Sequence, residues 1–254
     1  MSAEQLKGKS AVVTGGGTGI GAATAHRLAA EGAEVVIIGR RADVLAETAQ
    51  RVNTEVGADR VTTERCDLVD PEAVADLADR LSARPTVDVL VLNAGGGATY
   101  GDESTLPGMA DAWRTIFDLN VLSAVLITEA LRDRLTRPGA RIIAMSSIAG
   151  LRGPGAYGAA KAAINAWVMG LATELGPDGI TVNAIAPGFV PDTEFWTGRL
   201  TEQVVSSRLA QIPLGRAGTP EEVAATVSYL AGPGGGWTTG QILQVNGGAL
   251  LGRG

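Results

Sequence analysis

The sequence predicts an α/β fold in which a doubly wound, parallel sheet of seven strands is covered by helices on both faces. The first observation is that short runs of apolar, β-branched residues alternate along the chain with longer helical patterns. The second is that the runs around Val12 and Val35 are continuously apolar, as in strands that are buried on both faces. Such alternation indicates parallel strands joined by helices.

The predicted elements follow one another without a break in organisation. Strands are predicted over residues 10–14, 34–38, 60–63, 87–92, 141–145, 181–185 and 242–245. Helices are predicted over residues 19–31, 42–56, 71–83, 110–136, 155–176 and 220–231. No linker, repeat or low-complexity tract divides them, so we expect residues 1–254 to form a single domain. We expect the functional crevice at the carboxyl ends of the strands, where open α/β sheets bind ligands.

Composition excludes several classes of protein. The chain has 254 residues, of which 45% are hydrophobic and 19% are charged, as in an ordinary soluble globular protein. Its 21 lysines and arginines are outnumbered by 27 aspartates and glutamates, giving a net charge of −6. Because no concentrated basic patch is visible, we expect neither nucleic acid nor a membrane surface as a partner.

Single residues and the amino-terminal segment narrow the class further. Cys66 is the only cysteine, which excludes an intramolecular disulfide and fits a reducing compartment, so we expect the protein in the cytoplasm and Cys66 as a small buried hydrophobe. His26 is the only histidine and cannot build a multi-histidine zinc site, so no metal is expected. The start of the chain lacks the apolar run of a signal peptide, and apolar stretches elsewhere are too short to span a bilayer.

A glycine-rich turn joins the first predicted strand to the first helix. Residues 14–21 read Thr-Gly-Gly-Gly-Thr-Gly-Ile-Gly. Glycines permit a tight turn and let the backbone approach a pyrophosphate, whose charge a helix amino terminus stabilises. This context indicates a Rossmann-type dinucleotide site, although a plain strand-to-helix turn is the alternative. The residues of the turn expected to bind the cofactor are Gly15, Thr18, Gly19, Ile20 and Gly21.

The end of the second strand favours NADP(H) over NAD(H), which stays possible. A dinucleotide fold usually places here the residue that reads the adenosine ribose, and an acidic group accepts from the free 2′-hydroxyl of NAD. The chain has Gly39, Arg40 and Arg41 instead. Glycine leaves space, and guanidinium groups pair well with a 2′-phosphate. The alternative is that the arginines are solvated loop charges.

Tyr157 and Lys161 form the candidate proton-transfer pair. Their spacing of four residues within a predicted helix places both side chains on one helical face. A nearby cation favours the ionised form of a phenol, which makes it a usable proton donor and acceptor. Taken alone, the pair is also compatible with an ordinary solvated helix.

These motifs together resemble the short-chain dehydrogenase/reductase family, in its 3-oxoacyl-reductase-like branch, over nearly the whole chain. The glycine turn matches the family's Thr-Gly-x-x-x-Gly-x-Gly pattern, and residues 93–95 match its Asn-Ala-Gly segment, although Leu92 stands where an asparagine is common. The resemblance adds catalytic Asn120 and Ser147 to Tyr157 and Lys161. The further cofactor-binding residues that it implies are Asp67, Leu68, Asn93, Ala94, Gly95, Pro187, Gly188, Val190 and Thr193.

The resemblance also implies roles for these residues. Tyr157 would exchange a proton with the substrate oxygen, Ser147 would hydrogen-bond that oxygen, and Lys161 would lower the pKa of Tyr157 and bind the nicotinamide ribose. Asn120 would hold a water in a proton relay, or be an ordinary satisfied polar group. Asp67 would contact the adenine, or cap the following turn. Residues 190–213, with Phe195 and Trp196, would form a flap over the substrate, or these aromatics would only pack the flap onto the body.

Three functions remain open on the sequence. The leading one is an oxidoreductase that transfers a hydride between NADP(H) and a small carbonyl or secondary alcohol, such as a 3-oxoacyl thioester or a cyclic ketone. The second is an NAD-dependent alcohol dehydrogenase of the same family, and the third is a non-catalytic dinucleotide-sensing or scaffolding protein. From the family we expect a homotetramer or homodimer, with apolar residues such as Ile164 and Leu171 serving either an interface or the core.

Overall fold

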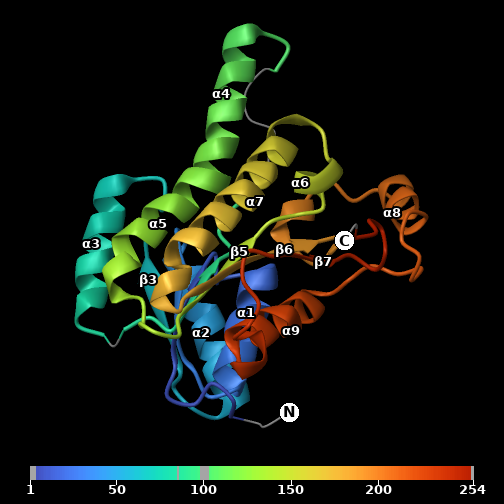
Figure 1. Cartoon of the computed structure of the whole chain (residues 1–254). Coiled ribbons are helices and arrows are strands. Elements are labelled where there is room, and N and C mark those ends of the chain that lie inside the picture. Colours follow the sequence, from blue (N-terminus) through green and yellow to red (C-terminus); the bar gives the residue numbers. More distant parts are fainter. Residues whose placement is uncertain (1–3, 85, 98–102, 253–254) are drawn as a thin grey trace.

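A seven-stranded, fully parallel sheet forms the centre of the computed structural model, which describes residues 4–84, 86–97 and 103–252 (Figure 1). The strand order is β3-β2-β1-β4-β5-β6-β7. This confirms the predicted fold class. From β1 to β3 the strands are added toward one edge of the sheet, and from β4 to β7 they are added toward the other edge, so the order reverses between β1 and β4. The strands are β1 (Ser10–Thr14), β2 (Glu34–Gly39), β3 (Val61–Arg65), β4 (Val89–Leu92), β5 (Arg141–Met145), β6 (Thr181–Pro187) and β7 (Ile242–Val245).

Helices cover both faces of the sheet and enclose two separate apolar cores. One face carries α1 (Gly19–Ala30), α2 (Ala42–Val56) and α9 (Pro220–Ala231), and the other carries α3 (Pro71–Ser82), α5 (Ser123–Leu131) and α7 (Gly155–Leu175). Neighbouring residues of β1 alternate between the cores, because Val12 packs with α3, α5 and α7 while Val13 packs with α1, α2 and α9. The continuously apolar strands are therefore buried on both sides, as predicted.

The helix predicted over residues 110–136 is observed as an uninterrupted helical segment from Leu106 to Arg134, but its hydrogen bonding is not α-helical throughout. The chain forms α4 (Leu106–Phe117), a π-helical turn (Asp118–Leu122), α5 and a short 3₁₀ turn (Arg132–Arg134). Inside the π turn, the Asn120 side-chain amide donates to the Ile116 carbonyl over 2.9 Å. A side chain that takes a backbone acceptor competes with the regular helical bond, which explains the π turn.

Two short helices complete the fold near the carboxyl ends of the strands. Helix α6 (Ala149–Arg152) follows β5, and the predicted flap contains a 3₁₀ turn (Glu194–Trp196) and α8 (Glu202–Leu209). Helix α4 projects away from the sheet, and α8 lies at the edge of the molecule (Figure 1). Cys66 is buried and unpaired, as expected. Among the helices in the described ranges, none is both long and apolar enough to cross a bilayer.

The packing of α1 against the glycine turn predicts a stability defect for Gly21→Ala. A Cβ atom on Gly21 would collide with the backbone oxygen of Gly15 and lie 2.6 Å from the Asn93 amide nitrogen. We expect this substitution to lower the free energy of unfolding by about 2 kcal/mol or more. Gly176→Ala is the matched control, because a Cβ there meets nothing within 4 Å and the backbone is helical. Denaturant titration that gave both variants wild-type stability would contradict the packing argument.

Candidate active site

One cavity of about 1060 Å³ opens at the carboxyl ends of the strands, where the sequence predicted the crevice. It extends from the loop after β2, past the glycine turn, to the flap. Gly21 and Asn120 were expected in the site but do not line this cavity. The expected residues that line it are Gly15, Thr18, Gly19, Ile20, Arg40, Arg41, Asp67, Leu68, Asn93, Ala94, Gly95, Ser147, Tyr157, Lys161, Pro187, Gly188, Val190 and Thr193.

Side-chain hydrogen bonds tie the ends of β1 and β4 together at the floor of the cavity. The Thr14 hydroxyl oxygen accepts from the backbone amides of Asn93 and Ala94, both over 2.9 Å. In return, the Asn93 side-chain amide donates to the carbonyls of Thr14 and Gly15 over 3.1 and 3.0 Å. Asn93 therefore holds the glycine turn in place, and its amide hydrogens are already engaged by the backbone.

The glycine turn offers backbone amides rather than side chains to the cavity. Thr18 is the residue before α1, and its hydroxyl makes no capping hydrogen bond to the first amides of that helix. Gly19 has a φ of +50°, and a Cβ there would lie 3.1 Å from Thr193 Cγ2. Thr193 of the flap thus lies against the turn, while its hydroxyl donates to the Val190 carbonyl over 3.1 Å. The arrangement suits an anion at the start of α1.

The two arginines after β2 have different surroundings. The Arg41 guanidinium donates twice to the Glu194 carboxylate of the flap, over 2.7 and 2.8 Å. Arg40 makes no ion pair with any carboxylate of the residues that the structure describes. The two arginines share the cavity wall, so Arg40 is the one whose charge stays available to an incoming anion.

Ser146 and Ser147, which follow β5, have different hydrogen-bond partners. Ser146 is buried, and its hydroxyl donates to the Lys161 carbonyl in α7 over 3.4 Å. Ser147 is partly exposed to the cavity, and its hydroxyl oxygen accepts from the Ala149 amide over 3.1 Å. Ser147 is therefore the serine that can meet a ligand, as the sequence pattern indicated.

Lys161 places an ammonium group in a buried position beneath the cavity. Its Nζ donates to the Met145 carbonyl at the end of β5 over 2.8 Å and lies 5.8 Å from the centre of the Tyr157 ring. A Cβ on Gly95 would lie 3.3 Å from this Nζ, so the glycine leaves room for the cation. Burial lowers the pKa of Lys161 to about 8, because the charged form loses its hydration.

Tyr157 is held in its protonated form in the structure. Burial raises the pKa of its hydroxyl to about 12, while the Ser147 hydroxyl and the Arg199 guanidinium act to lower it. The sequence assigned the lowering of this pKa to Lys161, whose Nζ donates to the Met145 carbonyl and lies 5.8 Å from the centre of the Tyr157 ring. At neutral pH Tyr157 is consequently a proton donor.

Asn120 acts on the loop after β4 instead of on the cavity itself. Its side-chain amide donates to the Gly96 carbonyl over 2.8 Å, and its side-chain oxygen accepts from the Gly96 amide over 3.2 Å. A Cβ on Gly95 would lie 2.6 Å from the same oxygen. The π turn thus fixes the loop at Gly95 and Gly96, which lies between the side chains of Asn120 and Lys161.

Phe195 of the flap lies over the candidate catalytic residues. Its ring centre is 5.2 Å from that of Tyr157, and a Cβ on Gly97 would lie 2.6 Å from its edge. Trp196 contacts both Phe195 and Phe189 in edge-to-face geometry. These aromatics therefore line the cavity and also pack the flap onto the body of the protein.

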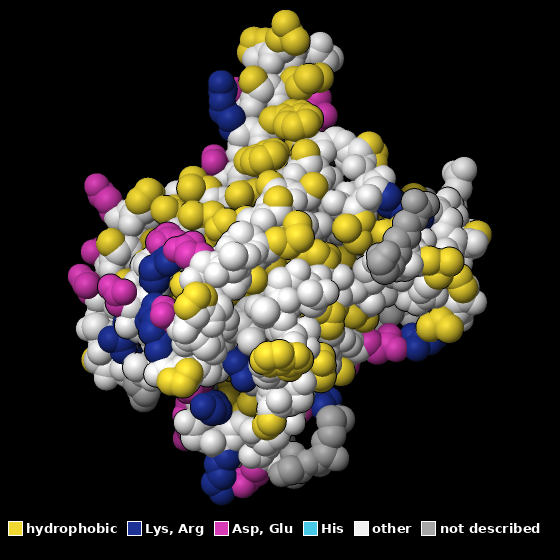
Figure 2. Space-filling model, in the orientation of Figure 1, with side chains coloured by type: hydrophobic (Ala, Val, Ile, Leu, Met, Phe, Trp, Pro, Cys, Tyr) yellow, Lys and Arg dark blue, Asp and Glu magenta, His cyan; other side chains and the backbone are white. Residues whose placement is uncertain are grey.

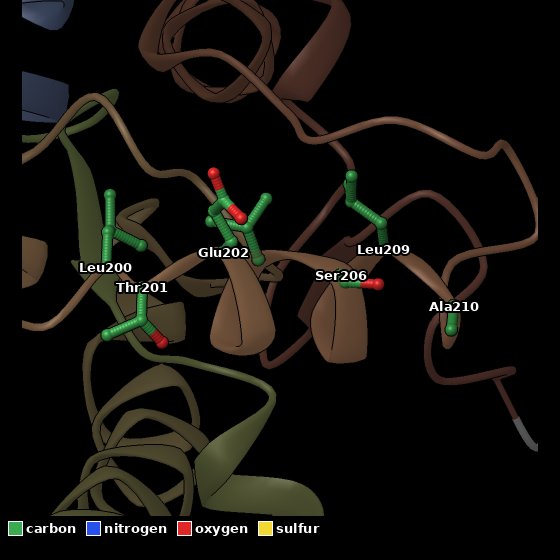
Figure 3. A pocket seen from close by; sticks show the side chains of 7 residues that line it. Leu200, Thr201, Glu202, Ser206, Leu209 and Ala210 are labelled. Atoms are coloured by element: carbon green, nitrogen blue, oxygen red, sulfur yellow. The ribbon is translucent and has the colours of Figure 1, made fainter.

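A second hollow lies on α8 itself and is lined by Leu200, Thr201, Glu202, Val205, Ser206, Leu209 and Ala210 (Figure 3). None of the expected site residues contributes to it. Within the described ranges, no group of three or more histidine, cysteine, aspartate or glutamate side chains is arranged to hold a metal ion. The larger cavity is therefore the candidate active site.

Comparison with known proteins identifies the family. A family model described as enoyl-(acyl carrier protein) reductase matches residues 15–249. The short-chain reductase protein NovJ of Streptomyces niveus is 40% identical over 94% of this chain and 92% of its own. The chain belongs to the short-chain dehydrogenase/reductase family. As a member of this family it is an oxidoreductase, which confirms the resemblance seen in the sequence.

Two further relatives of the family cover nearly the whole chain. The 3-oxoacyl-[acyl-carrier-protein] reductase FabG of Rickettsia prowazekii is 34% identical over 97% of this chain and 98% of its own. The active-site complex of RhlG with NADP from Pseudomonas aeruginosa superposes with a TM-score of 0.87 at 34% identity, covering 99% of this chain and 100% of that one. The likeness therefore extends to the flap as well as the sheet.

Several residues that shape this short-chain dehydrogenase/reductase site escaped the sequence prediction. Thr14 ties the crevice together, Gly97 makes room for Phe195, and Arg199 and Arg208 line the flap side of the cavity. Arg199 and Arg208 each lie over an aromatic ring, Phe195 and Trp196 respectively. The only sequence signal was the amphipathic flap, which did not show which of its side chains face inward.

The buried ammonium of Lys161 predicts a stability effect that depends on pH. The pKa of Lys161 is about 8 in the folded chain against 10.5 for an exposed lysine. Between pH 8 and 10.5 only the unfolded chain keeps this proton, so the contribution of Lys161 to stability rises with pH across that window. At pH 7 burying the charge costs about 3 kcal/mol.

Lys161→Met removes this cost together with one hydrogen bond worth about 1 kcal/mol. We therefore expect the variant to be about 2 kcal/mol more stable than the wild type at pH 7 and about 1 kcal/mol less stable above pH 10.5, where only the lost hydrogen bond counts. Denaturant titrations of both proteins across this pH range measure the difference. A stability difference that stays constant with pH would contradict the assignment of a buried ammonium.

Proposed function

We propose that the protein transfers a hydride between NADP(H) and a small carbonyl or secondary alcohol, with Tyr157 as the general acid and base. The observation that carries this proposal is the meeting of Tyr157, Ser147 and Lys161 in the same cavity as the glycine turn. The hydroxyl groups of Tyr157 and Ser147 line one end of the cavity, and the uncapped amides at the start of α1 line the other. This arrangement suits an elongated ligand whose phosphates meet the amides while a reacting carbonyl meets the hydroxyls.

The residues of the cavity fit a nicotinamide dinucleotide. Gly15 has a φ of +62°, and a Cβ there would approach Asn93 Nδ2 within 2.9 Å, so only glycine leaves the backbone exposed at this point. The turn would hold the pyrophosphate, Arg40 the 2′-phosphate, and Asp67 and Leu68 the adenine side. The bound cofactor supplies the hydride. Pro187, Gly188, Val190 and Thr193 line the wall toward the flap, where its nicotinamide end would lie.

Three side chains of the protein, Tyr157, Ser147 and Lys161, carry out the proposed proton transfer. During reduction, Tyr157 donates its hydroxyl proton to the carbonyl oxygen as the hydride reaches the carbon. Ser147 donates a hydrogen bond to the same oxygen where negative charge develops. Lys161 places a positive charge beneath the phenol, which favours the phenolate that remains after transfer. Because burial raises the pKa of Tyr157 to about 12, its hydroxyl carries at neutral pH the proton that this step transfers.

NADP(H) is preferred to NAD(H) because the end of β2 carries cations instead of a carboxylate. Gly39 and Arg40 line the cavity there, and the solved RhlG complex, 34% identical to this chain, contains NADP. An NAD-dependent dehydrogenase would more often place an acidic side chain at this point. A purely dinucleotide-sensing protein would not need Ser147, Tyr157 and Lys161 together.

The substrate class is a ketone or an alcohol, and a 3-oxoacyl thioester is one candidate, because FabG of Rickettsia prowazekii is named a 3-oxoacyl-[acyl-carrier-protein] reductase. The single domain would work in the cytoplasm, with residues 190–213 as its flap. We infer a homotetramer or homodimer from the apolar side chains that gather on α4 (Figure 2). Ile164 and Leu171 are buried in the core, whereas Leu106, Met109, Trp113 and Met169 are exposed.

Tyr157→Phe tests the proposed acid and base. This change removes only the hydroxyl, so we expect turnover of any accepted ketone to fall by about 10³-fold or more while NADPH binding stays within about two-fold. Steady-state NADPH oxidation and NADPH fluorescence titration measure the two quantities. Tyr229→Phe is the control, since Tyr229 is exposed on α9 and outside the cavity. Turnover near that of the wild type would rule Tyr157 out.

Arg40→Asp tests the proposed phosphate contact. Replacing the guanidinium by a carboxylate should weaken NADPH binding by about ten-fold or more and leave NADH binding nearly unchanged, because only NADPH carries the 2′-phosphate. Arg114→Asp makes the same charge change on an exposed part of α4. Fluorescence titration with both nucleotides gives the ratio of dissociation constants. Equal weakening of NADPH and NADH would show that Arg40 does not contact the phosphate.

A further inference from the structure

The charge in the cavity is opposite to the charge of the whole chain. The chain carries 21 cationic against 27 acidic residues. Among the described residues, the cationic ones that line the cavity are Arg40, Arg41, Arg152, Lys161, Arg199 and Arg208. The acidic ones are Asp67 and Glu194. Such a concentration of one sign within a concave site attracts ligands of the opposite sign.

Three of these arginines lie at the substrate end of the cavity rather than at the adenosine end. Arg152 is on α6, Arg208 is on α8, and Arg199 is in the segment of the flap that precedes α8 in the sequence. None of the three forms an ion pair with a carboxylate in the described ranges. Glu194, the acidic residue of the flap in this wall, is already bound by Arg41. Their charge is therefore available to a ligand.

Aromatic rings hold two of the guanidinium groups in place. Arg199 Cζ lies 5.1 Å from the centre of the Phe195 ring, and Arg208 Cζ lies 5.7 Å from that of Trp196. The rings of Phe195 and Trp196 pack edge-to-face with their centres 5.2 Å apart, so the two cations lie over two adjoining rings, which we call the aromatic platform. Stacking over a ring uses the face of a guanidinium and leaves the N–H groups at its edge for an anion.

The aromatic platform contacts Tyr157, the proposed proton donor, through Phe195. Phe195 lies 5.2 Å from the Tyr157 ring, and the charge of Arg199 acts on the Tyr157 hydroxyl. Arg152 approaches the same region from α6, where its Nη2 lies 3.5 Å from Gln211 Oε1 just beyond α8. The cofactor phosphates belong at the other end, beside the glycine turn and Arg40.

We propose that Arg199 and Arg208, together with Arg152, bind an anionic group of the substrate, a carboxylate or a phosphate, and so place its carbonyl beside Tyr157. This proposal rests on the proposed function and specifies its substrate class. A planar carboxylate or a phosphate can accept paired N–H bonds from guanidinium groups, which a neutral ketone cannot. The anion would be either a carboxylate on the ketone itself or a phosphate on the arm of a thioester.

Matched substrate pairs distinguish these two sources. The carboxylate pair is a 4-oxo acid and its methyl ester, and the phosphate pair is a 3-oxoacyl thioester of coenzyme A and the same thioester of N-acetylcysteamine. With wild-type enzyme and NADPH, we expect kcat/KM to be about ten-fold or more higher for the anionic member of one pair, through a lower KM. This preference should decrease at higher salt concentration.

The double variant Arg199→Gln/Arg208→Gln should reduce that preference to about two-fold or less through a higher KM for the anionic member, whereas any change in kcat caused by the loss of Arg199 beside Tyr157 should be the same for both members. Arg114→Gln, with an exposed guanidinium on α4 outside the cavity, is the matched control and should keep the preference. An equal loss for the anionic and neutral members, or a wild-type enzyme without any preference, would overturn the anion site.

A binding measurement separates this proposal from the proposed function. Calorimetric titration of the NADPH complex with pentanoate and with pantetheine 4′-phosphate should show binding of one of them, and the double variant should weaken it by about ten-fold. Binding without turnover of any ketone would support the anion site and contradict the proposed reduction. Turnover of neutral ketones without binding of either anion would support the proposed reduction and contradict the anion site.

Discussion

The hydrogen-bonded connection between the ends of β1 and β4 is the constraint on which the rest of the site depends. Strands β1 and β4 are paired neighbours at the point where the strand order reverses, and a crevice opens beyond their carboxyl ends because the chain leaves the two strands in opposite directions. Thr14 and Asn93 close the floor of this crevice by exchanging hydrogen bonds between side chain and backbone. The glycine turn on one side and Gly95 on the other are held by the same connection, so phosphate site and proton-transfer site keep a fixed separation.

The buried ammonium of Lys161 lowers the free energy of unfolding at neutral pH. Lys161 keeps an ammonium group among buried residues, where one backbone carbonyl replaces its hydration. Tyr157 sits against Phe195, and burial keeps its phenol protonated at neutral pH. The two-sided apolar core around the sheet supplies the stability that offsets such burial. Perturbed pKa values of this kind cluster at functional sites, which supports the proposed role of Tyr157 and Lys161 in proton transfer.

The sequence predicted the features that depend on local pattern. The strands, the covering helices and the glycine turn follow from periodicity and from backbone freedom at positions such as Gly15 and Gly19, and these predictions were confirmed. Contacts between distant residues could not be predicted in the same way. The pair Arg41 and Glu194 is separated by 153 residues, and the hydrogen bonds between Asn120 and Gly96 join positions 24 residues apart. Neither leaves a periodic signal in the chain.

Deuteride transfer tests the account most directly. NADPH carrying deuterium at the C4 position, on either face of the nicotinamide, is incubated with the protein and a panel of ketones and 3-oxoacyl thioesters. Mass spectrometry of the products should find one deuterium on the carbinol carbon, from one face only, since a single cavity orients both reactants. Products without deuterium from either face, or no product from the whole panel, would contradict hydride transfer as the function of this site.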